Sequence, residues 1–105
     1  MTTLLGFFTS SLREIFEVRE KNGVVLENLS LVNSDTVAHR IYLYMDNREK
    51  YQEQALVPIM KPGLSLAAGE SLRDTDKYAL TFGCRLFGKI EVEAPGLVSF
   101  AIFGS

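Results

Sequence analysis

The amino-acid sequence predicts an all-β fold: an antiparallel β-sandwich of about seven or eight strands, either jelly-roll-like or immunoglobulin-like. From about residue 12 onward, apolar and polar side chains alternate with a period of two, which is typical of half-buried strands. Turn-forming residues interrupt the alternation about every eight to twelve positions, as in sandwiches and barrels. The chain has 105 residues, of which 47% are hydrophobic, and this is enough for one domain with one core.

The first element is an apolar N-terminal arm over residues 1–11, ahead of a single sandwich domain over residues 12–105. The spacing of apolar residues is also close to helical, so a helix over 4–17 is the alternative to an extended arm.

The N-terminus lacks the basic region, long apolar region and cleavage site of a secretory signal. No run approaches the roughly 18 apolar residues of a membrane span, so we expect a soluble protein without a membrane partner.

The segments "REIFEVRE" (13–20) and "GVVLENLSLVN" (23–33) are predicted to be the next two strands, and Asn22-Gly23 between them predicts a hairpin turn. Asn33, Ser34 and Asp35 then predict a second tight connection. The strand "TVAHRIYLYMD" follows, and its successive side chains point to opposite faces. The face assigned to the core consists of Val37, His39, Ile41, Leu43 and Met45, and the outer face of Ala38, Arg40, Tyr42 and Tyr44.

The polar segment 46–54 is the main candidate for a long connection, either a loop or one short helical turn. Pro58 beyond it predicts an edge strand or an irregular segment because proline lacks an amide hydrogen. Turns are predicted at Lys61-Pro62-Gly63 and at Pro95-Gly96. The remaining strands are "KYALTFG", "KIEVEA" and "LVSFAIF". Tyr78, Leu80 and Phe82 share one face of the first of these strands, and Val98, Phe100 and Ile102 share one face of the last. On the second strand, Ile90 and Val92 are predicted to point inward.

The segment "FGCRLFGKIEVEA" (82–94) contains the pattern G-x-x-x-x-G-K of a phosphate-binding P-loop, from Gly83 to Lys89. A P-loop also requires a helix after the glycines and a Ser or Thr after the lysine. Ile90 occupies the hydroxyl position, and "KIEVEA" alternates as a strand. The segment is therefore predicted to form two strands and a turn, with Gly83 and Gly88 at a turn or bulge, and no nucleotide cofactor is expected.

No other group of residues gives strong evidence for a reactive or metal-binding site. Cys84 and His39 are the only pair that could form a thiolate–imidazole dyad, but they lie on different predicted strands, and an inert buried thiol is favoured. A single His and a single Cys leave no ligand set for zinc. Asp74 and Asp76, with Glu70, could offer oxygen ligands to a hard cation, but a solvated turn is favoured. We therefore predict no catalytic, cofactor-binding or metal-binding residues and no enzymatic activity.

The charge distribution argues against a nucleic-acid partner. The net charge is −2, and the 11 basic residues are scattered along the chain and do not cluster. The single cysteine cannot form an internal disulfide, which suits a reducing cytoplasm.

The outer face of the strand at 36–46 favours a binding role. Tyr42 and Tyr44 share this face with Arg40, and Tyr51 follows shortly after. Exposed aromatic residues serve as anchors in protein interfaces or stack on sugars, unless the rest of the domain covers them. Contiguous apolar residues in the N-terminal arm also indicate an association surface. The candidate interface residues are Leu4, Leu5, Phe7, Phe8, Arg40, Tyr42, Tyr44 and Tyr51.

Taken in order, "GVVLENLSLVNSDTVAHRIYLYM", "ALVPIMKPGLSLAAGESL", "YALTFGCRLFGKIEVEA" and "LVSFAIFG" resemble a layout that recurs among small bacteriophage and prophage virion proteins. In that layout a strand ending in Asn leads through a polar turn to an alternating strand, and a "G-E-S-L"-like turn precedes an apolar strand. The resemblance covers about residues 12 to 104. The sequence departs from the layout at Cys84, where an acidic residue often follows the glycine, and in the added "RLFG".

The resemblance implies a β-sandwich subunit of a capsid, neck or tail, with no enzymatic activity. It implies a homo-oligomer that contacts other virion or assembly proteins and is located in the virion, or in the host cytoplasm before assembly. The alternative is a carbohydrate- or peptide-binding module on the same fold, with Tyr42, Tyr44, Arg40 and Tyr51 as its platform.

Overall fold

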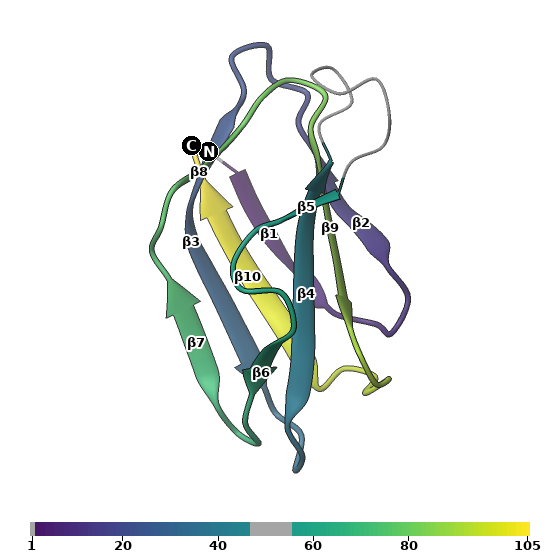
Figure 1. Ribbon diagram of the computed structural model, residues 1–105. Helices are drawn as coiled ribbons and strands as arrows, with labels where there is room; N and C mark the ends of the chain where they lie inside the picture. Colours follow the sequence, from purple (N-terminus) through teal and green to yellow (C-terminus); the bar gives the residue numbers. More distant parts are fainter. Residues whose placement is uncertain (1, 47–55) are drawn as a thin grey trace.

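The computed structural model describes residues 2–46 and 56–105, and within these ranges the protein is all-β. Ten strands in the described part form two antiparallel sheets that pack face to face (Figure 1). The count exceeds seven or eight because β1 was predicted as an arm, and because β6 and β7 have only three and four residues, too few for alternation to be recognised. The strands are β1 (Thr2–Phe7), β2 (Arg13–Glu17), β3 (Val24–Asn33), β4 (His39–Asp46), β5 (Leu56–Pro58), β6 (Leu64–Leu66), β7 (Ser71–Asp74), β8 (Tyr78–Leu80), β9 (Arg85–Ile90) and β10 (Val98–Gly104).

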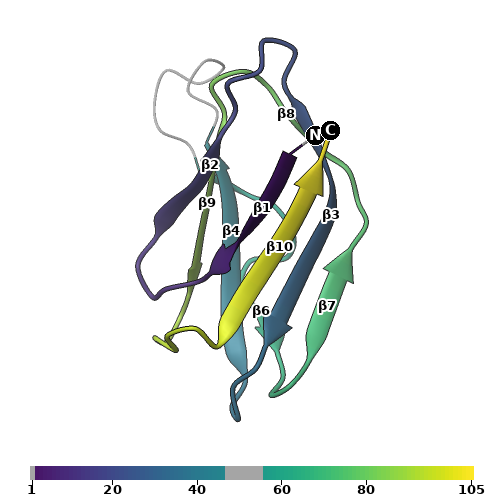
Figure 2. The ribbon, with the colours of Figure 1, turned by 180° about the vertical axis from the view of Figure 1, so that it is seen from behind.

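The two sheets contain strands from both halves of the chain. Sheet 1 has the order β1-β10-β3-β7, with β8 also paired to β3, and sheet 2 has the order β2-β9-β4-β5, with β6 also paired to β4. The chain changes sheet after β1, β2, β3, β6, β8 and β9. The first and last strands are neighbours, so the two ends of the chain lie close together in both views (Figures 1 and 2).

The hairpin predicted at Asn22-Gly23 does not form. β2 pairs with β9 and β3 pairs with β10, so the segment 18–23 carries the chain from sheet 2 to sheet 1. The turn itself is present, because the Gly23 amide donates to the Glu20 carbonyl at 2.9 Å and Gly23 has a φ of 79°. The turn residues thus predicted that the chain changes direction here, but they did not predict which strands pair.

The core lies between the two sheets. The predicted inner face of the strand at 36–46 is confirmed for His39, Ile41 and Leu43, which are buried, and for Met45, which packs against the core. Burying one large aliphatic side chain contributes about 1.5–3 kcal/mol, so a core of this kind is the main source of stability. The fully buried aliphatic side chains include Leu26, Leu29, Leu31, Leu66, Leu80, Leu86, Ile90, Val98 and Ile102.

Three residues that the alternation groups with buried residues are exposed. They are Val37, Phe82 and Val92, and they lie just outside β4, β8 and β9 respectively. Alternation predicts the face of a residue only while the strand continues, and these strands are shorter than the sequence pattern indicated.

The helix considered for residues 4–17 is wrong, because this segment forms β1, a connection and β2. β1 pairs with β10 along its whole length, which satisfies its backbone groups on that side. Burial alternates from one residue to the next along β1, from Leu4 on the inner side to Phe7 on the outer side, so the period is two and not the helical period.

Residues 82–94 contain one strand and not two. A turn at Thr81–Cys84, in which Gly83 has a φ of 84°, leads directly into β9. Gly88 lies inside β9, and a Cβ at this position would come within 2.7 Å of Phe8 Cε1 and 2.9 Å of Ile15 Cδ1. Gly88 therefore permits close packing of the core, and the G-x-x-x-x-G-K pattern falls on a turn and a central strand.

The proline predictions are confirmed. Pro58 lies in β5, at an edge of sheet 2. At Pro62-Gly63 the Leu64 amide donates to the Lys61 carbonyl (3.2 Å), and Gly63 has a φ of 68°. The turn at Pro95-Gly96 closes in the same way, with a Gly96 φ of 72°. Proline followed by a glycine of positive φ is typical of a type II turn.

The connection between β3 and β4 is organised by Asp35. Its Oδ1 accepts the Thr36 amide at 2.7 Å, and its Oδ2 lies 2.7 Å from Nε2 of the buried His39. The hydrogen bond with His39 is the largest cause that lowers the pKa of Asp35, followed by the bond with the Thr36 amide.

We expect Asp35→Asn to remove a pH-dependent part of the stability. The folded-state pKa of Asp35 lies below its unfolded value of about 3.9, so the ionised carboxylate stabilises the fold above that pH. This contribution is lost as the pH falls through the folded pKa. The difference in free energy of unfolding between the two proteins, measured by urea denaturation, should therefore narrow below about pH 4. A difference that stays constant from about pH 5 down to about pH 2 would contradict this expectation.

Candidate interaction surfaces

The outer face of sheet 1 is largely apolar where β1, β10 and β3 lie side by side, and β1 and β10 contain no charged residue. Leu5 is 72% exposed and Phe7 is 61% exposed, and Val32 and Phe103 are also exposed. Figure 2 looks onto this side of the molecule. We call this surface the apolar face. It consists of the cross-strand rows Phe7–Ser99–Val32, Leu5–Ala101–Ser30 and Thr3–Phe103–Asn28.

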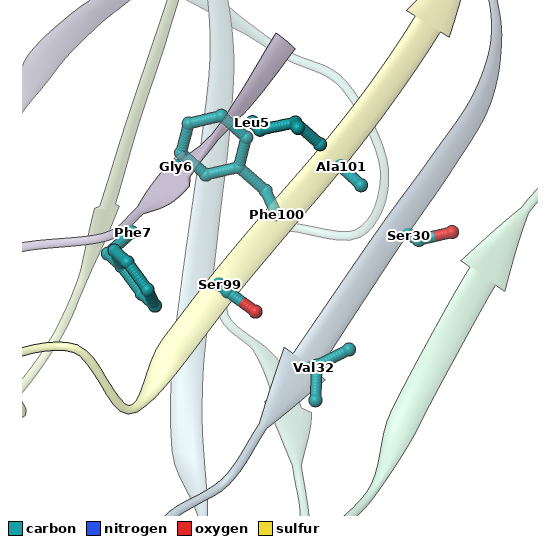
Figure 3. Close-up of a pocket in the computed structure, with 8 residues that line it drawn as sticks. All are labelled: Leu5, Gly6, Phe7, Ser30, Val32, Ser99, Phe100 and Ala101. Atoms are coloured by element: carbon teal, nitrogen blue, oxygen red, sulfur yellow. The ribbon is translucent and has the colours of Figure 1, made fainter.

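A groove with a volume of about 390 Å³ runs over the apolar face. The small side chains of Ser99 and Ala101, on the central strand β10, form its floor (Figure 3). Leu5 and Phe7 stand on the β1 side, and Val32 stands on the β3 side. Exposed contiguous apolar surface of this kind marks association sites on soluble proteins.

The packing on the inner side of β1 explains why Leu5 and Phe7 lie on the outer face. Gly6 points inward, and the ring of Phe100 fills the space beneath it, because a Cβ on Gly6 would lie 2.8 Å from Phe100 Cζ. Phe100 in turn packs against Phe8, with ring centroids 5.0 Å apart. The alternate residues Leu5 and Phe7 are therefore left on the outer face.

The structure divides the predicted N-terminal patch between the two sides of β1. Leu5 and Phe7 lie on the apolar face, whereas Leu4 packs against the core and Phe8 is only 3% exposed. Phe8 is thus inside the sandwich and out of reach of a partner. Sequence patterns did not single out Val32, which joins the same surface only through the register between β3 and β10.

The outer face of sheet 2 carries the predicted tyrosines. The rings of Tyr42 and Tyr44 lie side by side, with centroids 6.4 Å apart and planes 11° apart. Lys89 Nζ lies 5.5 Å from the centroid of Tyr42, which adds a cation–π contact. Arg40 is at the rim, and Tyr51 lies outside the described residues.

Charged residues surround the tyrosine pair. Arg40 Nε lies 3.7 Å from Glu91 Oε2, and both side chains are exposed. At the far end of β4, Asp46 is fully buried, and its Oδ2 lies 2.6 Å from Arg85 Nη2. The hydrogen bond to Asp46 is the largest cause that raises the pKa of Arg85. Both tyrosines are only half exposed, so this face offers a partner less apolar area than sheet 1 does.

Cys84 and His39 do not form a dyad. Arg85 lies opposite Asp46 in the register of β4 and β9, so Cys84 and His39 lie at opposite ends of this strand pair, roughly 25 Å apart. Burial is the main cause that raises the pKa of the Cys84 thiol, and the charge of Asp46 adds to it. A raised pKa disfavours the thiolate, which is the nucleophilic form.

Asp74 and Asp76 form a turn. Asp74 Oδ1 accepts the Asp76 amide at 2.8 Å, and Asp74 Oδ2 accepts the hydroxyl of Tyr78 at 2.6 Å. Burial is the main cause that raises the pKa of Tyr78 to about 12, and the hydrogen bond with Asp74 is the second cause. Glu70 lies beyond the other end of β7, where Oε1 accepts the Ala67 amide at 3.2 Å. The described residues contain no group of three or more His, Cys, Asp or Glu side chains that could hold a metal ion.

Comparison of the chain with protein-family models, with curated proteins and with solved structures found no match in any of the three. In the described ranges, no helix is long and apolar enough to cross a membrane. Among the described surfaces, the apolar face of sheet 1 is the one whose chemistry indicates a role.

Proposed function

We propose that this protein is a non-enzymatic structural or adaptor subunit of a phage-type particle, such as a capsid, neck or tail, and that it acts through contacts with other protein chains. The observation that carries the proposal is the apolar face, where Leu5 and Phe7 are exposed beside an uncharged groove. The phage-type setting rests on the resemblance of the strand and turn layout to small virion proteins.

The groove suits a protein surface better than a small molecule. Sites for small ligands enclose most of the ligand and carry a few placed polar groups that fix its orientation. Here the lining offers only the hydroxyls of Ser30 and Ser99 as polar side chains. An apolar side chain of a partner could sit over Ser99 and Ala101, between Phe7 and Val32, and exclude water from all of them.

We expect Val32→Glu to weaken association of the protein with its partners by at least about tenfold, because contact would bury an unpaired carboxylate. Val37→Glu is the matched control, since Val37 is also an exposed valine but lies in the β3–β4 connection, away from the apolar face. Sedimentation equilibrium over a range of concentrations measures self-association. Thermal unfolding followed by circular dichroism checks that both variants are folded.

Co-expression with the proteins encoded by neighbouring genes, followed by electron microscopy, tests the role in a particle. A strict monomer that joins no assembly would contradict the proposal. Equal effects of Val32→Glu and Val37→Glu would show that the apolar face is not the contact. Binding of sugars that quenches the fluorescence of Tyr42 and Tyr44 would instead favour the carbohydrate-binding alternative.

A further inference from the structure

β1 is an edge strand without the usual protection against pairing. Among the described strands it pairs with β10 alone, on one side. Its sequence, TTLLGF, contains no charged residue and no proline. An edge strand offers unpaired N–H and C=O groups to another strand, and soluble proteins ordinarily guard such edges with charges, prolines, bulges or very short strands.

The other edges of the two sheets do carry such protection. β2 contains three charged residues and a bulge between Glu14 and Phe16. β7 contains Arg73 and Asp74, β5 contains Pro58, and β6 and β8 have only three residues each. β1 is therefore the edge of the described sheets that is left open for pairing.

The free backbone groups of β1 belong to the residues of the apolar face. The Phe8 amide donates to the Val98 carbonyl at 2.9 Å, so even-numbered residues at this edge bond to β10. By the alternation of an antiparallel ladder, the N–H and C=O groups of Thr3, Leu5 and Phe7 point away from β10, toward the open edge. Their side chains are on the outer face.

We propose that β1 pairs edge to edge and antiparallel with β1 of a second copy of this chain, around a two-fold axis at Leu5. This rests on the proposed function and names one of its contacts. The pairing places Leu5 opposite Leu5, and Thr3 opposite Phe7 of the second copy, so the free N–H and C=O groups of all three residues are satisfied. On the inner side, the large Leu4 lies opposite Gly6 of the second copy.

A second copy is favoured over other strands because β1 is neutral. Pairing β1 with β2 or β7 of another molecule would place uncharged residues beside charged ones, whereas β1 with β1 joins two uncharged strands. A two-fold contact is also closed: it uses the open edge of both copies and leaves none for a further copy. The two apolar faces then form one continuous surface across the joined sheet.

A cysteine at the axis tests the register. In a bonded antiparallel pair, opposite Cα atoms lie about 5.5 Å apart, which a disulfide can bridge. Leu5→Cys should therefore give a covalent dimer under mild oxidation. Thr3→Cys is the control, because its two copies would lie about 14 Å apart along the strands. The wild-type protein should give no covalent dimer, because its Cys84 is buried. Equal cross-linking of Leu5→Cys and Thr3→Cys, or none by either, would overturn the proposal.

Proline at the same position tests the backbone contact. Leu5→Pro removes an N–H that points to the open edge, so the contact with β10 is kept while the dimer should weaken by at least about tenfold. Leu4→Pro is the control for the fold, because the Leu4 N–H points toward β10 and its loss should lower the stability of the monomer. Sedimentation equilibrium gives the dimer constant, and urea unfolding gives the stability.

The outcomes separate this inference from the proposed function. If Val32→Glu blocks association with other particle proteins while Leu5→Pro dimerises like the wild type, the edge pairing is wrong and the proposed function stands. If Leu5→Cys cross-links and Leu5→Pro is monomeric, but no particle forms with the neighbouring gene products, the edge dimer stands and the proposed function falls.

Discussion

Replacement of Gly23 by alanine is expected to lower the free energy of unfolding by about 3 kcal/mol, through two effects at one position. Gly23 has a φ of 79°, a region that costs an L-residue about 1–2 kcal/mol. In addition, a Cβ at Gly23 would lie 2.5 Å from the carbonyl oxygen of Leu80. This oxygen belongs to the backbone of β8, which pairs with β3, so it cannot move aside without disturbing sheet 1.

Gly96→Ala is the matched control for this experiment. Gly96 has a φ of 72°, close to that of Gly23, but a Cβ there would meet no atom within 4 Å. We therefore expect a loss of only about 1 kcal/mol, from the backbone conformation alone. Urea denaturation followed by circular dichroism measures both variants. Equal losses of unfolding free energy would mean that the short distance between position 23 and β8 does not contribute to the destabilisation.

Replacement of Asn33 by alanine is also expected to cost about 3 kcal/mol, because it removes donors and acceptors from a fully buried site. The Asn33 Nδ2 group lies 2.9 Å from the Val37 carbonyl oxygen and 3.0 Å from that of Leu66. Its Oδ1 accepts the Asp35 amide at 2.9 Å. Asn33 thus ties the β3–β4 connection to the end of β6, and alanine would remove these hydrogen bonds, of which the one to the Leu66 carbonyl is buried.

Two further substitutions identify the cause of this loss. Asn33→Asp keeps the size but replaces the donor by an oxygen that faces the Leu66 carbonyl, so at neutral pH it should destabilise at least as much as alanine. Asn28→Ala removes an asparagine on the outer side of the same strand, where Oδ1 accepts only from Arg73 at 3.0 Å and 3.3 Å, and should cost less than about 1 kcal/mol. A similar loss for Asn28→Ala and Asn33→Ala in urea denaturation would refute the buried hydrogen bonds as the cause.

The strands and several turns of this fold could be predicted from local sequence, because each depends on a few consecutive residues. Alternation placed Ile41 and Leu43 inside, and proline with glycine placed the turn at Pro62-Gly63. Strand pairing could not be predicted in the same way. The partner of β2 is β9, about seventy residues further along the chain, and nothing local to Asn22-Gly23 distinguishes a hairpin from a crossing between sheets.

The interaction surfaces were predictable only in part. Leu5 and Phe7 were identified because they are apolar and contiguous, but Phe8, which has the same character, lies in the core because it falls on the other side of the strand. The groove between β1 and β3 depends on β10 lying between them with small outward residues. That arrangement comes from the register of three strands and not from the pattern of any single one.

The position of β10 also matters while the protein is being made. β10 is made after all the other described strands, yet it separates β1 from β3 in the middle of sheet 1. On the ribosome, β1 has no neighbour among the described strands of its own sheet until residues 98–104 have left the exit tunnel. Sheet 1 therefore cannot close before β10 emerges, and until then the apolar residues of β1 lack the strand that pairs with them.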